Sequence, residues 1–272
     1  MEFLRLFYQN IQSALSTLQI DKRITTNPML GSPMFMVLIF ATYLFIVRKW
    51  GPKFMEDRKP FKVEGLMKLY NVMQIFLNAF IFYEAVRYSY WRSDFSFKCQ
   101  AHDPTDMSLE TIKGTRPAYL YYLTKYLDLF DTIFFLLRKK YNQISFLHVY
   151  HHALMILGTH LYVSKAFGSH LTLIGVINSF IHVVMYTYYL AAAMKINIDL
   201  KPWKKTMTTM QLIQFVVLLI HQSLPLVDNS CNLNKWLVLL STTQCVFMII
   251  LFGNFYYHSY IRTDKKKKLT LI

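Results

Sequence analysis

The chain has 272 residues, of which 54% are hydrophobic, and its apolar runs are longer and more frequent than the core of a soluble domain requires. This pattern excludes an ordinary soluble protein. A formal net charge of +15 could indicate nucleic-acid binding, but the basic residues lie mostly in loops between apolar runs, so we expect no nucleic-acid partner. The composition predicts a membrane protein.

Seven segments of about 20 residues are apolar enough to cross roughly 30 Å of hydrocarbon as helices. The sequence therefore predicts an all-α membrane protein with seven transmembrane helices, built as a single domain over residues 1–272. The first span is short and serves as its own signal anchor, because no cleavable signal peptide precedes it. The predicted spans are 33–48, 66–91, 118–137, 144–163, 168–190, 206–226 and 236–260.

Lysine and arginine are concentrated in alternate loops, and the loops between them carry fewer basic residues over longer segments. The positive-inside rule assigns the basic loops to the cytosol. The N-terminus is then luminal and the C-terminus cytosolic, which requires an odd number of spans. We divide the chain into a luminal segment (1–32), a membrane core (33–260) and a basic cytosolic tail (261–272). The basic segments are 48–62, 138–140, 195–205 and 262–268.

The three cysteines are too few for a disulfide scaffold. Cys99 and Cys231 fall in two loops assigned to the luminal side, where oxidation is permitted. Cys245 lies inside the last span and has no plausible partner at its depth. We therefore predict a disulfide between Cys99 and Cys231.

The third span carries charges inside the apolar run. Lys125 and Asp128 are three residues apart on one helical face and can form an ion pair, which lowers the cost of carrying either charge into the bilayer. Asp131 lies beside them. The same group could also serve as a structural network that fixes helix pairing, and this alternative stays open.

Three histidines lie on one face of the fourth span. His148, His151 and His152 are spaced at three and four residues within an apolar run, so their side chains point the same way. Ionisable groups at membrane depth mark functional sites by default. We predict these three as catalytic, together with His182 of the fifth span.

Polar residues of four spans lie at similar depth. Counted at about 1.5 Å per residue, they are roughly 6–15 Å from the cytosolic ends, so we expect one site. The two glutamines of the sixth span could instead hold helices together. The predicted supporting residues are Lys125, Asp128, Asp131, Asn178, Tyr186, Tyr189, Gln211 and Gln214.

Two kinds of chemistry suit such a histidine cluster. Histidines at this spacing can bind iron or zinc, as in membrane lipid desaturases and hydroxylases, but the chain has nine histidines and one cluster, too few ligands for two irons. A neutral imidazole can also act as a nucleophile or base in acyl transfer. We favour acyl chemistry without a metal or other cofactor. A metal-dependent desaturase or hydroxylase remains the alternative, and a receptor or transporter is disfavoured.

Five short motifs occur in order over most of the chain. Together they resemble those of the very-long-chain fatty acid elongases, which are membrane 3-ketoacyl-CoA synthases. Asp128 stands where that family commonly has glutamate. The motifs are Gly51-Pro52-x-x-Met55-x-x-Arg58-x-Pro60-Phe61, Lys125-x-x-Asp128-x-x-Asp131-Thr132, His148-x-x-His151-His152, His182-Val-x-Met185-Tyr186-x-Tyr188-Tyr189 and Thr208-x-x-Gln211-x-x-Gln214.

The resemblance implies condensation of a long-chain acyl-CoA with malonyl-CoA, which releases CO2 and CoA and gives a 3-ketoacyl-CoA two carbons longer. We expect His151 to accept the acyl group, with His182 and His152 stabilising developing charge. An acyl tunnel should run from the histidines toward the lumen. Basic residues at the cytosolic mouth should bind CoA phosphates. The expected CoA-binding residues are Arg138, Lys139, Lys201, Lys204 and Lys205.

The resemblance also implies residence in the endoplasmic reticulum membrane, in contact with membrane lipid. The sequence itself carries no clean dilysine retrieval signal, because no lysine is third from the end. Candidate protein partners are the ketoacyl-CoA reductase, dehydratase and enoyl reductase of the elongation cycle, and a homodimer is a candidate assembly.

Overall fold

The computed structural model describes residues 21–25, 28–228 and 230–262, and within these ranges the chain forms helices and no strands. Most of the expected N-terminal segment, and the tail beyond Arg262, lie outside the described residues. The helices are α2 (Lys22–Thr25), α3 (Pro28–Gly31), α4 (Pro33–Phe45), η1 (Ile46–Trp50), α5 (Gly51–Met55), α6 (Glu64–Arg87), α7 (Leu109–Leu127), α8 (Leu129–Leu137), η2 (Tyr141–Gln143), α9 (Phe146–Lys165), α10 (Thr172–Met194), α11 (Lys201–Val227), α12 (Lys235–Tyr256) and η3 (Tyr257–Ile261).

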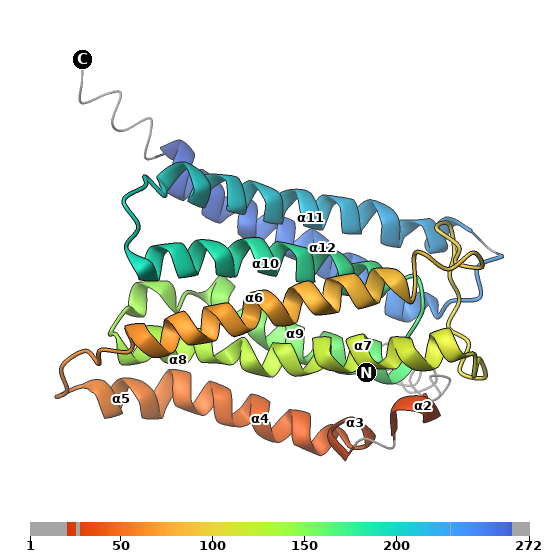
Figure 1. Ribbon diagram of the computed structural model, residues 1–272, viewed down its shortest axis with the longest axis horizontal. Helices are drawn as coiled ribbons and strands as arrows, with labels where there is room; N and C mark the ends of the chain where they lie inside the picture. Colours follow the sequence, from red (N-terminus) through yellow and green to blue (C-terminus); the bar gives the residue numbers. More distant parts are fainter. Residues whose placement is uncertain (1–20, 26–27, 229, 263–272) are drawn as a thin grey trace, which may run out of the picture.

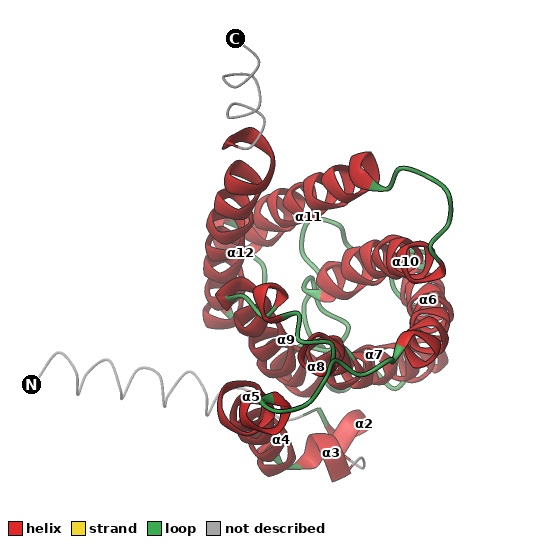
Figure 2. Cartoon of the chain, turned by 90° about the vertical axis from the view of Figure 1, so that its left-hand side faces the viewer, coloured by secondary structure: helices red, strands yellow, loops and turns green. Residues whose placement is uncertain are grey.

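The long helices lie side by side along the long axis of the molecule (Figure 1). Seen end-on, they form a ring in which α12, α11, α10, α6, α7–α8 and α9 follow one another, with α4 and α5 outside it (Figure 2). Helix α4 packs on α9, and α5 packs on α8. Between α9 and α12 the ring is joined by a hydrogen bond from the Tyr150 hydroxyl to the Gln244 side chain.

Five helices among the described residues are long and apolar enough to cross a membrane. This supports a multi-pass membrane protein, but it does not establish the seven spans expected from the sequence. Helices α7–α8 and α9 are the two expected spans that are not among the five, because α7 carries four charged residues, α8 has only nine residues and α9 carries four histidines. The five are Pro33–Met55, Glu64–Arg87, Thr172–Met194, Lys201–Val227 and Lys235–Ile261.

Two boundaries differ most from the sequence prediction. The helix expected to end at 48 continues through η1 and α5 to Met55, because Pro52 lies in the first turn of α5, where a missing N–H costs nothing. The helix expected to begin at 118 begins at Leu109, where the Ser108 hydroxyl accepts a hydrogen bond from the Thr111 amide and caps the first turn.

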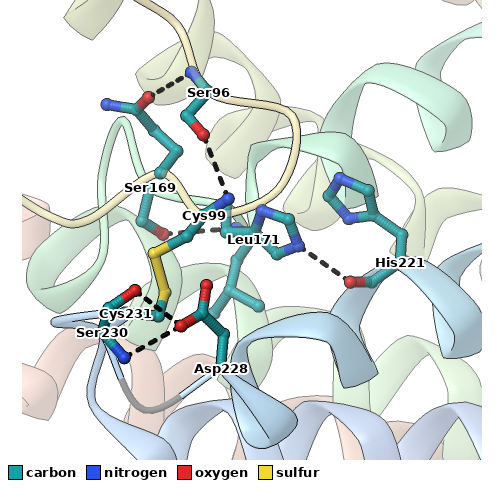
Figure 3. Close-up of a disulfide and its surroundings, with 10 residues drawn as sticks. Ser96, Cys99, Ser169, Leu171, His221, Asp228, Ser230 and Cys231 are labelled. Carbon is teal, nitrogen blue, oxygen red and sulfur yellow. Dashed lines mark hydrogen bonds between the residues drawn. A yellow bond between two sulfur atoms is a disulfide. The ribbon is translucent and has the colours of Figure 1, made fainter.

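The two ends of the bundle differ in character. The end formed by the loops 56–63, 138–145 and 195–200 is rich in lysine and arginine, and we call it the basic end (left in Figure 1). At the opposite, disulfide end, Cys99 of the 88–108 loop is joined to Cys231, with Cα atoms 5.7 Å apart (Figure 3). This is the pair that the sequence predicts. The bond ties the loop after α6 to the loop before α12.

The 88–108 loop is further held by an acidic side chain. Hydrogen bonds from the Thr111 hydroxyl and the Ser108 amide lower the pKa of the Asp106 carboxyl to about 2. Arg92 lies 3.5 Å from the same carboxylate and also contacts Asp94. The Arg23 guanidinium donates a hydrogen bond to the Asp106 carbonyl, which anchors α2 to this loop. The disulfide end is therefore cross-linked covalently and by ion pairs.

Candidate active site

A buried ion pair marks the junction between α7 and α8. The Lys125 ammonium donates to Asp128 Oδ2 at 2.9 Å and to Asn178 Oδ1 at 2.9 Å, and the two charged residues are 1% and 3% exposed. A buried charge is tolerated when it is paired and its remaining hydrogen-bonding capacity is used. Because Asn178 belongs to α10, the lysine also joins α7 to α10, its second neighbour in the ring.

Asp128 accepts hydrogen bonds from other helices as well. Gln74 Nε2 of α6 lies 3.0 Å from Asp128 Oδ1, and the Tyr186 hydroxyl of α10 lies 2.9 Å from the same oxygen. The Tyr186 hydroxyl is also 2.9 Å from Asp131 Oδ2. The predicted group Lys125, Asp128, Asp131, Asn178 and Tyr186 is thus brought together in one hydrogen-bonded network.

Sequence reasoning missed the contribution of α6. Tyr70 donates to the Leu127 carbonyl at 3.1 Å and lies 3.2 Å from the Tyr186 hydroxyl, and Gln74 donates to Tyr70 at 2.9 Å. Asn78 donates to Gln74 one turn later. The spacing of four residues within an apolar span was the available signal for these positions.

The histidines begin at the first turn of α9, where Ser145 caps the helix by accepting from the His148 amide at 3.2 Å. His148 Nε2 lies 2.8 Å from Thr132 Oγ1, which in turn lies 3.0 Å from the Tyr43 hydroxyl of α4. The rings of His148 and His152 are 4.3 Å apart between centroids, and those of His151 and His152 are 5.6 Å apart. The predicted cluster therefore forms one group.

His182 reaches the same network from α10. Its Nδ1 is 3.7 Å from Asp128 Oδ2, and its ring lies 5.7 Å from the ring of Tyr186. One turn earlier, Asn178 accepts from the Tyr121 hydroxyl at 3.1 Å. His182 thus lies beside a carboxylate, although its Nδ1 makes no hydrogen bond among the described residues.

A cavity of about 530 Å³ opens beside the network. Its walls come mainly from α9, α10, α11 and α12, with α4 on one side, and they are largely apolar. Of the four predicted catalytic histidines, His151 is the one that lines it, together with the predicted supporting residues Asn178 and Gln214. The arrangement brings a histidine to the wall of an apolar chamber, as transfer of a long acyl group requires.

Residues 28–268 match the profile of the ELO family, described as the GNS1/SUR4 family. The chain belongs to this family. It is 34% identical to very long chain fatty acid elongase 7 of Drosophila melanogaster over 274 residues, covering 100% of this chain and 82% of that one. It is 38% identical to very long chain fatty acid elongase 1 of Homo sapiens over 246 residues, covering 89% and 87%. The resemblance drawn from the motifs is thereby confirmed.

Three predicted polar residues of this GNS1/SUR4 protein lie around the network rather than within it. Gln214 is buried, and among the described residues its Oε1 has no hydrogen-bond partner. Gln211 is half-buried and does not line the cavity. Tyr189 packs beside Tyr70 and Tyr186 as a partly buried aromatic.

The five predicted CoA-binding residues of the family member all lie at the basic end (Figure 1). Lys201, Lys204 and Lys205 are exposed on the first turns of α11. Arg138 contacts the Met67 sulfur at 3.6 Å, and Lys139 donates to the Glu56 carbonyl at 3.0 Å. The α11 lysines are thus free of the packing that holds the other two.

The histidines of this protein do not have the layout of a metal centre. In the part of the chain that the structure describes, no group of three or more His, Cys, Asp or Glu side chains could hold a metal ion. The donor set thus does not favour the desaturase or hydroxylase alternative.

Proposed function

We propose that this protein is the condensing enzyme of fatty acid elongation, a very-long-chain 3-oxoacyl-CoA synthase. It joins a long-chain acyl-CoA to malonyl-CoA and releases CO2 and CoA. Family membership supports the reaction class. The observation that carries the assignment of the site is that His151, within the histidine cluster, lines an apolar cavity of about 530 Å³.

In the first step, an imidazole nitrogen of His151 attacks the thioester carbonyl. A C–N bond forms as the C–S bond breaks, and CoA leaves as a thiolate that takes up the proton lost by the imidazole. The product is an acyl-imidazole, which is itself a reactive acyl donor. A nucleophile divides one difficult condensation into two easier acyl transfers.

In the second step, malonyl-CoA loses CO2, and the electron pair of the broken C–C bond forms an enolate. The enolate carbon attacks the acyl carbon, the C–N bond breaks, and the imidazole regains a proton from solvent. His182 and His152 stabilise the negative charge that develops, with Asn178 and Gln211 as further donors. Asn178 is the better placed of the two, because it lines the cavity beside His151.

The remaining predicted residues orient the histidines. His148 is held by Thr132, and His182 lies against Asp128, whose own position is set by Lys125 and Tyr186. No metal or other cofactor takes part in this scheme. The cavity keeps the acyl chain out of water, and each buried methylene contributes about 0.8 kcal/mol.

We further propose that the chain spans the endoplasmic reticulum membrane seven times, with a luminal N-terminus and a cytosolic C-terminus. Helices α7–α8 and α9 run the length of the bundle beside the five apolar helices (Figure 1). Their polar groups face the network, which lowers the cost of placing them in lipid. The exposed lysines of α11 bind CoA phosphates at the cytosolic mouth. The other enzymes of the cycle and a second copy of this chain are candidate partners.

The test is to incubate purified protein in detergent with a panel of acyl-CoAs and radiolabelled malonyl-CoA. We expect label in 3-ketoacyl-CoA products two carbons longer than the substrate, and none with His151→Ala. His160→Gln is the matched control, because His160 lies on the same helix but does not line the cavity. If folded wild-type protein labels no product from any acyl-CoA, the proposed function is wrong.

A further inference from the structure

A second, smaller cavity lies next to the main one. It measures about 40 Å³, and its walls come from the ends of α6 and α9 and the starts of α7 and α10, at the disulfide end of the bundle. Three residues line both cavities, namely Tyr121, Tyr162 and Gly175. These residues therefore form the partition between the two spaces.

Tyr162 occupies the partition on the side of α9. It is 11 residues after His151 on the same helix, which places it roughly 16 Å along the axis from the acyl-accepting side chain. Its hydroxyl lies 2.9 Å from Thr172 Oγ1, and its ring packs against the apolar cluster Ala166, Leu171 and Leu237. Both contacts hold the ring in the wall that separates the two cavities.

Tyr121, in contrast, cannot be changed independently of the catalytic network. Its hydroxyl bonds to Asn178, and its ring lies 4.7 Å from the Lys125 ammonium, so it is tied to the catalytic network. Gly175 carries no side chain, and a Cβ there would be in ordinary contact with the Tyr121 ring at 3.5 Å. Tyr162 is therefore the residue of the partition that can be changed without touching the chemistry.

The smaller cavity suits the methyl end of an acyl chain. Its lining is mostly apolar, and small residues such as Gly114, Ala85 and Ala118 leave the space open. Gly168 adopts φ +71°, a conformation that residues with a side chain rarely take. Glycine is therefore favoured here, and no side chain at this position fills the cavity. The space is larger than one water needs, and the hydroxyls of Ser89, Tyr121 and Thr172, which line it, already bond to other protein groups.

We propose that Tyr162 limits the length of the acyl chain that this enzyme elongates. This inference rests on the proposed function. An acyl chain bonded at His151 extends along the main cavity until its methyl end meets the Tyr162 ring. A chain two carbons longer must displace that ring from Thr172 and from its apolar neighbours, so elongation stops there.

The experiment compares the products of wild type and Tyr162→Ala from a series of acyl-CoAs, measured by mass spectrometry. Removing the ring joins the two cavities, so the longest product should gain at least two carbons. The rate with the first acyl-CoA that wild type rejects should rise about tenfold or more, since each methylene in an apolar pocket discriminates by that order. Tyr162→Leu serves as a second variant should the alanine protein not fold.

Two controls separate the partition from general loosening of the core. Tyr162→Phe keeps the ring and should keep the wild-type product length. Leu161→Ala enlarges the main cavity without reaching the smaller one, and should also leave the longest product unchanged. Adding Ala85→Leu to Tyr162→Ala refills the smaller cavity and should reverse the extension.

The outcomes distinguish this inference from the proposed function. If wild type condenses no acyl-CoA, the proposed function fails, and this inference fails with it. If wild type is active but folded Tyr162→Ala and Tyr162→Leu keep its longest product, Tyr162 does not set the limit, and the condensing reaction stands. Equal extension by Leu161→Ala would likewise overturn the role of the partition.

Discussion

At the residue scale, the Lys125–Asp128 pair holds the site together, because its partners come from α6, α7 and α10. Removing one charge leaves the other buried and uncompensated, and such a loss typically costs about 3–5 kcal/mol. We expect Lys125→Met to lower the free energy of unfolding by this amount, measured by denaturant unfolding in detergent.

The double variant Lys125→Met/Asp128→Asn is the matched test of this pair. Asparagine keeps a carbonyl oxygen for Gln74 and Tyr186 and removes the stranded charge, so part of the lost stability should return. If the loss in free energy of unfolding of the double variant equalled the sum of the losses of the two single variants, the two charges would not interact.

We expect Thr132 to act on catalysis through His148. Thr132→Val removes the hydroxyl that lies between His148 Nε2 and Tyr43 while keeping the shape of the side chain. A typical hydrogen bond contributes about 1 kcal/mol, which corresponds to roughly fivefold in rate. We expect kcat to fall by that factor with KM nearly unchanged.

Thr187→Val is the control for this change, because the Thr187 hydroxyl bonds only to a carbonyl of its own helix. Its kcat should match wild type. A Thr132→Val enzyme with wild-type kcat would show that His148 needs no orienting partner.

The sequence singled out the charged and histidine residues that the structure brings together, because ionisable groups are costly in lipid and rarely occur there without a role. Gln74, Tyr70 and Tyr43 were missed because neutral polar and aromatic side chains are common in membrane helices and carry little signal individually. Gln211 was predicted from its spacing along α11, and in the structure it is half-buried and does not line the cavity. Spacing along one helix does not determine the distance to neighbouring helices.

At the element scale, the continuous helix from Pro33 to Met55 depends on Gly51. A Cβ at this position would lie 2.4 Å from Leu136 Cδ2 of α8 and 2.6 Å from the Ile46 carbonyl oxygen. The Leu136 side chain could shift, but the backbone oxygen belongs to the preceding turn and has little freedom. The missing side chain thus permits close packing of α5 on α8.

We expect Gly51→Val to destabilise the protein by about 1–3 kcal/mol through overpacking, seen as a lower midpoint in thermal unfolding. Gly65→Ala is the matched control, because nothing lies within 4 Å of a Cβ at that position. It should be neutral or slightly stabilising, since alanine favours the helix. A Gly51→Val protein as stable as Gly65→Ala would contradict the packing described here.

The sequence predicted the long helices well, because apolar runs of about 20 residues are a strong signal. It placed the start of α7 nine residues late, because Leu109 to Pro117 is polar and the capping role of Ser108 was not used. It also ended the first span at residue 48, before Pro52, although proline is favoured in a first turn.

At the scale of the whole molecule, the number of spans depends on whether α7–α8 and α9 cross the bilayer. If they do, the 138–145 loop is cytosolic, whereas with five spans it lies on the opposite side. We expect Asn142→Cys, an exposed position in this loop, to react with a membrane-impermeant thiol reagent added outside sealed microsomes. Asp103→Cys, in the loop at the disulfide end, should react only after the membrane is opened.

Labelling of Asp103→Cys but not Asn142→Cys in sealed vesicles would show that the orientation is the reverse of the proposed one. Protection of both positions would support five spans.

Ring closure and the two cavities could not be predicted from the sequence, because both depend on which helices become neighbours, and the sequence does not specify helix order around a ring.

In the proposed reaction, His151 accepts the acyl group before malonyl-CoA reacts. The most direct measurement mixes the purified enzyme with acyl-CoA alone and follows free CoA release and protein mass. We expect a burst of up to one equivalent of CoA per site and a mass increase equal to the acyl group, both abolished by His151→Ala. Active enzyme that shows neither CoA release nor an adduct without malonyl-CoA would contradict the covalent role of His151.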